Sequence, residues 1–181
     1  MADVEIVNIA ASGDLGLEVD IEQLVKDVDI PVANYDPDFN ASFLRFEEEA
    51  SELIILYTSG KYIVRGGDTY EILHKTHDKF LSLLRDLRIE VGEPEFEIKN
   101  VVCVSDLERT VDLNQLTILL GMEETEYEPE QFPGLVYRPT DSPCVLLIFA
   151  TGKVVITGGR SKEDDIFAFT SLLNELDEFE E

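Results

Sequence analysis

Residues 143–159 read PCVLLIFATGKVVITGG. Two apolar runs, VLLIF and KVVIT, flank the turn at residues 150–153, and this order predicts a β-hairpin. An antiparallel pair normally packs one face on the core and wets the other, so apolar and polar residues alternate along it. Here residues 146–149 are all apolar, and no polar face remains. The hairpin therefore predicts a second apolar face that a binding partner covers.

The same hairpin is half of an internal repeat. A shift of 92 residues aligns residues 4–24 with 96–116, and YTSGKYIVRGG (57–67) with FATGKVVITGG (149–159). NYDP (34–37) matches EYEP (126–129) in the same alignment. Two copies of this length are too few and too long for a solenoid. We expect two repeats, 1–92 and 93–181, the second ending in a short acidic tail, that share one continuous structure.

Each copy shows the same order of elements. An alternating strand (4–12, 96–104) precedes a short helix, for which Asp20 and Asp112 are the expected N-caps. Three or four strands joined by short turns follow, predicted from the sequence at 42–46, 52–57 and 61–65, and at 135–139, 145–149 and 153–157. A longer amphipathic helix closes each copy, over 69–87 and 162–176. The order βαββββα, taken twice, predicts an α+β fold of about ten antiparallel strands with helices on one face.

The composition is that of a globular chain with an extreme charge. Hydrophobic residues make up 44%, and 39 Asp and Glu face 14 Lys and Arg, a net charge of −25. Taken alone, this charge argues against nucleic acid as a partner. It also fits adaptation to molar salt, where repulsion is screened within about 3 Å. No apolar run reaches a membrane span and the N-terminus has no leader pattern, so we expect a cytoplasmic protein with Cys103 and Cys144 as reduced core thiols.

The basic residues suggest what covers the apolar face. They lie within or at the ends of the strands that flank it, at corresponding places in the two copies: Arg45, Lys61, Arg65, Arg138, Lys153 and Arg160. A basic rim around an apolar sheet suits a duplex whose phosphates run along both edges. Strand-edge Lys and Arg that merely deter aggregation explain the same pattern. The residues alone leave both interpretations open.

Two segments carry a specific resemblance. EYEPEQFPGLVYR (126–138) and LLIFATGKVVITGGRS (146–161) resemble the TATA-binding protein family in its archaeal form, and the repeat extends the resemblance over essentially the whole chain. The resemblance implies a pseudo-symmetric saddle with helices on the convex face and the minor groove of promoter DNA on the other. It also implies a general transcription initiation factor that kinks A·T-rich (TATA-box) DNA and recruits the B-type initiation factor and, indirectly, RNA polymerase. The charge adds a halophilic host to this expectation.

Site residues follow from the resemblance by position. The kinking aromatics fall on Phe132, Phe149, Tyr57 and Phe39. Base-edge and groove positions fall on Asn8, Asn100, Thr157, Arg65, Val102, Leu147, Val155, Ile55 and Ile63. Phosphate contacts fall on Arg45, Lys61, Arg138, Lys153 and Arg160. The contact with the initiation factor falls on Glu128, Glu130 and Gln131.

Copy one departs from the family pattern. Arg65 stands where copy two has Thr157, and Asp68 stands where it has Arg160. The segment before the FPG motif (132–134) is one residue shorter in copy one. Either Phe39 or Asn40 therefore corresponds to the kinking residue Phe132. We expect weaker or altered recognition by this copy. The alternative function is a divergent paralogue that acts mainly by docking proteins.

No catalytic signature is present. His74 and His77 lie one helical turn apart, but no cysteine or acidic third ligand accompanies them, and we expect them on the solvent side of their helix. No nucleophile elbow or Gly-rich phosphate loop occurs. We therefore expect no enzyme activity, no metal and no cofactor. The apolar face also allows two copies to pair as a homodimer when DNA is absent.

Overall fold

The computed structural model describes residues 3–178, so the last three residues of the predicted acidic tail lie outside the described residues. The chain divides into two compact units: a first unit, Asn8–Lys99, and a second unit that joins Met1–Val7 to Asn100–Glu181. The predicted repeat boundary at residues 92 and 93 does not coincide with this division and stays a prediction. Within the described residues, no helix combines the length and apolarity needed to cross a membrane.

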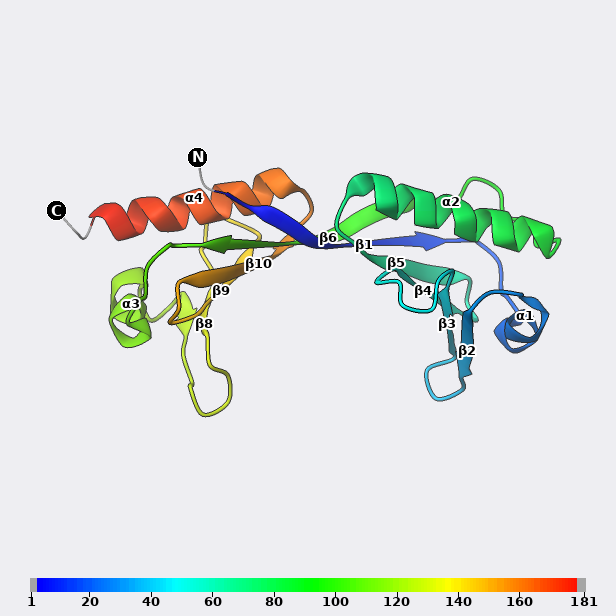
Figure 1. The fold of residues 1–181 in the computed structure, drawn as a ribbon, viewed down its shortest axis with the longest axis horizontal. Helices are drawn as coiled ribbons and strands as arrows, with labels where there is room; N and C mark the ends of the chain where they lie inside the picture. Colours follow the sequence, from blue (N-terminus) through cyan, green and yellow to red (C-terminus); the bar gives the residue numbers. More distant parts are fainter. Residues whose placement is uncertain (1–2, 179–181) are drawn as a thin grey trace. The chain divides into compact units, whose positions relative to one another are not determined.

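The first unit is a layer of antiparallel strands covered by helices (Figure 1). In the order of the sheet, its strands are β2 (Val32–Asp36), β3 (Ala41–Arg45), β4 (Leu53–Tyr57), β5 (Lys61–Gly67) and β1 (Glu5–Asp14), whose first residues belong to the second unit. Helix α2 (Tyr70–Asp86) packs on β5, and helix α1 (Ile21–Asp27) packs against β2 and β3. Within residues 8–99, no helix lies on the opposite face (Figure 1).

The second unit has the same arrangement (Figure 1). Its strands follow the order β6 (Phe96–Asp106), β10 (Lys153–Gly159), β9 (Val145–Ile148), β8 (Leu135–Tyr137) and β7 (Thr125–Glu126). Helix α4 (Lys162–Glu178) packs on β10, and helix α3 (Leu113–Leu120) packs against β7 and β8. The predicted hairpin is β9 and β10, which pair from Val154 with Ile148 to Thr157 with Val145.

The helices begin where the sequence offers a side-chain cap. Asp20 accepts a hydrogen bond from the backbone N–H of Gln23 at 3.0 Å, and Asp112 accepts one from Asn114 at 2.9 Å. Thr69 caps α2 in the same way. Each cap satisfies a backbone donor that the first turn of a helix leaves unpaired. Both predicted aspartate caps are therefore confirmed.

Alternation along the strands decides which face is buried. In β5, Tyr62 and Val64 are 1% exposed, and the Tyr62 ring lies 5.0 Å from that of Phe80 on α2. In β10, Val154 and Ile156 are fully buried beneath α4. The residues between them point to the other side of each sheet. The core of each unit thus lies between its sheet and its long helix.

Two strands were not predicted from their residues. The predicted order βαββββα includes four strands between the helices of each copy, but residue ranges were predicted for only three of them; the fourth is β2 in the first unit and β7 in the second. β2 reads VANYD and β7 is two residues long, so neither carries an apolar alternation long enough to be recognised.

Candidate nucleic-acid interface

The sheet face opposite α2 or α4, called the open face of each unit, carries a row of aligned side chains. In the first unit, cross-strand pairing aligns Ser12, Ile63, Ile55 and Phe43. In the second unit, it aligns Val104, Val155, Leu147 and Val136. All eight side chains are half-buried, while their neighbours along the strands are mostly buried. The hairpin is apolar on both faces because one face packs on helices and the other belongs to this row.

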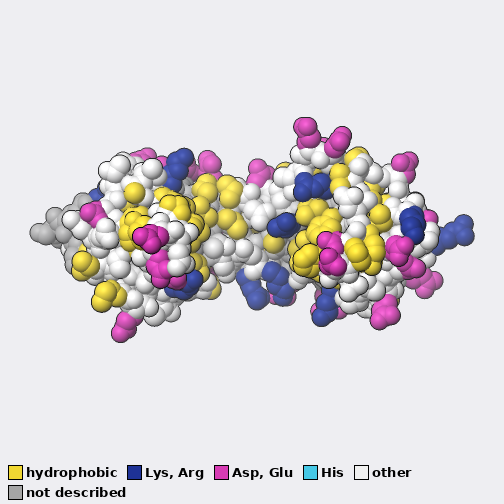
Figure 2. All heavy atoms as spheres, turned by 90° about the horizontal axis from the view of Figure 1, so that it is seen from below, with side chains coloured by type: hydrophobic (Ala, Val, Ile, Leu, Met, Phe, Trp, Pro, Cys, Tyr) yellow, Lys and Arg dark blue, Asp and Glu magenta, His cyan; other side chains and the backbone are white. Residues whose placement is uncertain are grey.

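Figure 2 shows the open faces from below. Hydrophobic side chains gather on both units, and Lys and Arg side chains lie among and beside them on the first unit. Acidic side chains also lie among the hydrophobic ones on both units.

The predicted aliphatic positions lie on the open faces. Ile55, Ile63, Leu147 and Val155 are members of the two rows, and Val102 is half-buried one alternation away from Val104. Sequence analysis missed four further positions of the rows, although strict alternation from the predicted residues would have found them: Ser12, Phe43, Val104 and Val136.

At the end of the second unit's row, two predicted kinking residues form a pair. The rings of Phe132 and Phe149 meet edge to face with centroids 5.8 Å apart. Gly134 makes this possible, because a Cβ on it would lie 2.8 Å from Phe132 and 3.1 Å from Phe149. Both rings are half-buried and form a contacting aromatic pair, the aromatic wedge.

The first unit lacks this pair. Asn34 pairs with Phe43 in the first unit, and Glu126 pairs with Val136 in the second. Asn34 and Glu126 are 92 residues apart, but Phe43 and Val136 are 93 apart. The first copy is therefore one residue shorter between these two positions. With Phe43 aligned to Val136, Phe39 is the residue of the first repeat that corresponds to Phe132, and Ala41 corresponds to Gly134. Ala41 is buried and carries a methyl group where the second unit has a glycine. Within residues 3–178, Phe39 makes no ring contact and is 69% exposed, and Tyr57 is half-buried.

Two asparagines, Asn8 and Asn100, are held alike in the two units. Asn8 Oδ1 accepts a hydrogen bond from the backbone N–H of Gly66 at 2.9 Å, and Asn100 Oδ1 accepts one from Gly158 at 2.7 Å. Asn100 Nδ2 also donates to Thr157 Oγ1 at 3.1 Å. The corresponding position in the first unit is Arg65, which is exposed. The two amide groups are therefore held in the same way, but Thr157 lies beside Asn100 whereas Arg65 stands at the corresponding position in the first unit.

The predicted phosphate-binding residues differ in exposure and in the contacts that their side chains make. Lys61 and Lys153 are exposed at the starts of β5 and β10. Arg45 donates a hydrogen bond to the carbonyl of Ala50 and so holds the β3–β4 loop. Arg138 lies 3.5 Å from Glu126, an exposed pair that contributes little stability. Arg160 is exposed and follows β10.

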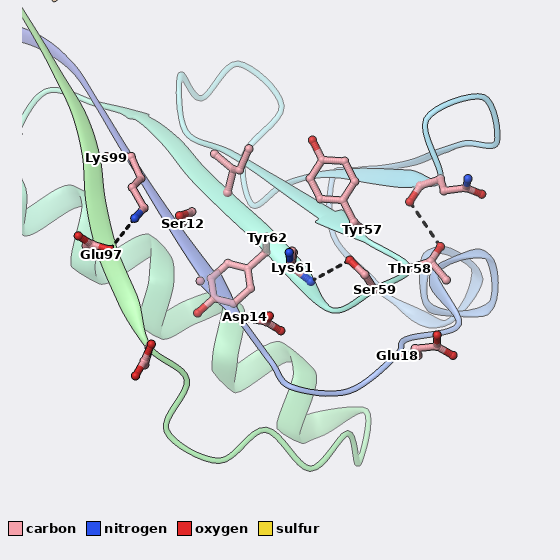
Figure 3. Close-up of a pocket in the computed structure, with 14 residues that line it drawn as sticks. Ser12, Asp14, Glu18, Tyr57, Thr58, Ser59, Lys61, Tyr62, Glu97 and Lys99 are labelled. Atoms are coloured by element: carbon pink, nitrogen blue, oxygen red, sulfur yellow. Dashed lines mark hydrogen bonds and ion pairs between the residues drawn. The ribbon is translucent and has the colours of Figure 1, made fainter. Parts of the chain in front are cut away.

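A hollow borders the open face of each unit. In the first unit it measures about 950 Å³, and Ile63 is one of the residues that line it. Ser12, Tyr57 and Lys61 also line it (Figure 3). In the second unit a hollow of about 930 Å³ is lined by the corresponding Val104, Phe149, Lys153 and Val155. Each hollow therefore places a predicted kinking aromatic beside a predicted phosphate-binding lysine. Acidic side chains, such as Asp14 and Glu18, also line the first (Figure 3).

The loop between β7 and β8 carries the residues predicted to contact an initiation factor. Glu128, Glu130 and Gln131 are all exposed. The backbone N–H groups of Gln131 and Phe132 both donate to the carbonyl of Glu128, at 2.9 and 3.0 Å. The loop is a closed turn that presents two carboxylates next to the aromatic wedge.

The predicted placement of His77 on the solvent side is wrong. Its side chain is buried, Nε2 lies 2.8 Å from the Tyr62 hydroxyl, and the ring stacks on Phe96 at 3.7 Å. Burial lowers the pKa of His77 and raises that of Tyr62 to about 12. His74 is exposed, as expected. Within residues 3–178, no group of three or more His, Cys, Asp or Glu side chains is placed to hold a metal ion.

Both cysteines are free and buried, as predicted, and they surround a buried acid. Cys144 Sγ lies 3.3 Å from Asp165 Oδ1. Asp165 is fully buried, and its Oδ2 has no hydrogen-bond partner among the described residues. Burial raises the pKa of Asp165 and that of the Cys144 thiol, the latter to about 11. The thiols are therefore protonated, unreactive parts of the core.

Comparison with known proteins assigns the family. The model of the family "Transcription factor TFIID (or TATA-binding protein, TBP)" matches residues 3–87 and again residues 95–179. The chain belongs to the TATA-binding protein family. Membership supports a role as a general transcription factor, and TBP is a family of DNA-binding factors rather than of enzymes.

Individual TBP relatives agree with this assignment. TATA-box-binding protein C of Halobacterium salinarum is 50% identical over 163 residues, which cover 88% of this chain and 90% of the relative. TATA-box-binding protein 2 of Haloferax volcanii is 37% identical, over 96% of this chain and 93% of the relative. The predicted archaeal and halophilic affiliation is thus confirmed.

A solved TBP structure confirms the fold class. The TBP of Methanococcus jannaschii superposes with a TM-score of 0.82 at 36% identity, over 97% of this chain and 99% of that chain. The predicted α+β fold is confirmed: the described residues form four helices and ten antiparallel strands.

Proposed function

We propose that this TBP binds A·T-rich promoter DNA in the minor groove through the open faces of its two units. Phe132 and Phe149 enter a base step as apolar wedges and kink the duplex, and Tyr57 with Phe39 does so less effectively. The minor groove of A·T pairs presents only acceptors and no guanine amino group, so an apolar surface fits it closely. The rows of both open faces supply that surface.

The observation that carries this proposal is the Phe132–Phe149 pair beside an apolar row. A monomeric protein rarely leaves a contiguous apolar face exposed unless a partner covers it. A rigid aromatic wedge at the end of such a face fits unstacking of a base step, which costs a few kcal/mol and is offset by the extra surface that the bent DNA contacts.

We infer that the bound chain recruits the B-type initiation factor and, through it, RNA polymerase. The exposed loop with Glu128, Glu130 and Gln131 supports this step, because it lies directly before the wedge. No part of this activity needs a cofactor or a catalytic group. The chain would act on the nucleoid in the cytoplasm of an archaeal cell.

The net charge of −25 makes salt part of the proposal. At low salt, the acidic surface repels DNA over a long range, and added cations screen this repulsion. Contacts of lysine and arginine with phosphates weaken as salt rises, whereas burial of the apolar rows is less sensitive. Affinity should therefore rise with KCl over some range.

The test is energy transfer between dyes at the two ends of a short TATA duplex, titrated with protein at several KCl concentrations. We expect the ends to approach on binding, most strongly at high KCl, and a G·C-substituted duplex to give no change. Absence of binding at every KCl concentration would refute the proposal. Affinity that falls steadily from low salt would refute the salt argument alone.

A second candidate is a divergent paralogue that mainly docks proteins. The observations that favour it are the exposed Phe39 and the change from Arg160 to Asp68 in the first repeat, which places a negative charge where the second repeat has a positive one. Under this candidate, Phe149→Ala leaves protein docking unchanged. Sedimentation of the free chain separately tests whether open faces pair two copies as a homodimer.

A further inference from the structure

The open faces of the two units differ chemically at one central position. In the second unit, Thr157 is small, half-buried and hydrogen-bonded to Asn100. In the first unit, Arg65 occupies the corresponding place on β5. The neighbouring asparagines are held by the same backbone bond in both units, so the difference rests on residues 65 and 157.

Arg65 has apolar surroundings and no counter-charge. Its cross-strand neighbours are Ala10 on β1 and Leu53 on β4. No ion pair or side-chain hydrogen bond joins Arg65 to another residue among the described residues 3–178.

The other arginines on the open faces are engaged, which sharpens the contrast. Arg45 holds the carbonyl of Ala50, and Arg138 lies near Glu126. Leu53 beside Arg65 is 6% exposed, whereas Val145, which pairs with Thr157, is half-buried. The alkyl part of an arginine can cover apolar neighbours while its charged end stays free.

We propose that Arg65 is a specificity-determining residue that sets the orientation of the chain on DNA; this rests on the proposed minor-groove binding. A guanidinium group has five donors and no acceptor. Every base pair offers it acceptors in the minor groove, but a G·C pair adds the guanine amino donor, which a guanidinium cannot accept. The first repeat therefore rejects a G·C pair at the position that Arg65 reaches.

Thr157 behaves differently because a hydroxyl group both donates and accepts. It can accept a hydrogen bond from a guanine amino group, so the second repeat tolerates a G·C pair that the first repeat rejects. On a site with one G·C pair in one half, the first repeat takes the half that is purely A·T. We expect this orientation to be preferred by about tenfold, the lower range for one mismatched base pair.

The experiment measures orientation directly. A donor dye is attached through Asp38→Cys, an exposed position in the β2–β3 loop of the first unit, and an acceptor is placed on either end of the duplex. Labelling is selective because both native cysteines are buried. Three duplexes are compared: a pure A·T core and two mirror-image cores with a single G·C pair in one half.

The unsubstituted labelled chain should place its first repeat at the A·T end of both mirror-image duplexes. Arg65→Thr should bring the two orientations to near equality, and adding Thr157→Arg to that variant should reverse the preference. Reversal also shows that the variants are folded. Binding with an orientation ratio that Arg65→Thr leaves unchanged would overturn the role of Arg65 alone. If no chain binds the pure A·T core, the proposed function fails as well.

Discussion

The rings of Phe132 and Phe149 meet edge to face with centroids 5.8 Å apart, whereas Phe39, opposite Phe132 in the other repeat, makes no ring contact among residues 3–178. Gly134 leaves room for both rings in the second repeat, whereas Ala41 stands at the corresponding place in the first. Under the proposed function, the second repeat brings a ring pair that is already in contact, and the first repeat does not.

Phe149→Ala should weaken binding to the TATA duplex at least tenfold and remove most of the bend, because half of the wedge is lost. The end-to-end energy-transfer titration measures both effects. Phe167→Ala is the matched control, since Phe167 is 53% exposed on α4. Equal losses for the two variants would contradict a wedge at Phe149.

Gly134→Ala should convert the second repeat to the arrangement of the first. Its Cβ would lie 2.8 Å from Phe132, so the rings must separate. We expect a smaller bend and a loss of about 1 to 3 kcal/mol in the free energy of unfolding, as overpacking typically costs. Urea unfolding and energy transfer measure the two effects. The reciprocal Ala41→Gly leaves the wedge of the second repeat intact, so an equally reduced bend in that variant would contradict the explanation.

His77 should make the protein less stable as the pH falls. Burial holds the pKa of His77 below its usual value, opposed by Asp78 and assisted by His74. The unfolded chain therefore takes up a proton first, and stability is lost as the pH falls through about 6.5 towards the lowered folded value. His77→Phe, which copies Phe169 of the second repeat, should flatten this dependence in thermal unfolding between pH 5 and 8, at about 1 M KCl to screen the acidic surface. His74→Gln is the exposed control and should keep the slope.

Asp165 should act in the opposite direction. Burial raises the pKa of Asp165 in the folded state, so its neutral form is favoured there and stability is lost as the pH rises through that value. Asp165→Asn should increase the free energy of unfolding at pH 7 by about 1 to 3 kcal/mol, because it removes an ionisable group whose charged form is disfavoured by burial. The exposed Glu163→Gln on the same helix is the control. A less stable Asp165→Asn would show that the carboxylate is needed.

The repeat alignment predicted most of the fold from the sequence. Asp20 and Asp112 were recognisable as caps because each precedes an apolar helix, and the hairpin because two β-rich runs flank a glycine turn. Both features depend on residues that are close together in the sequence, so the sequence alone indicates them. β2 and β7 escaped because pairing with β3 and β8, rather than their own residues, makes them strands.

The sequence predicted which positions form the candidate site, but not which side-chain contacts they make. The sequence does not show that Arg45 is tied to Ala50, or that His77 turns inward to Tyr62, because both depend on side chains that meet only in the folded unit. The row residues Phe43 and Val136 are a different case, because alternation along their strands indicates them from the sequence alone.

The division of the chain also bears on whether one repeat is complete by itself. Met1–Val7 belong to the second unit, where Val4 is 3% exposed and the Asp3 carbonyl accepts a hydrogen bond from Ser105 at 2.7 Å. In a chain of one repeat, the position that these first residues occupy in the second unit would be empty unless a second molecule supplied its own first strand. A chain of one repeat could fill this place only by exchanging first strands with a second molecule. Halves made separately from this chain would have to find each other again before either is complete.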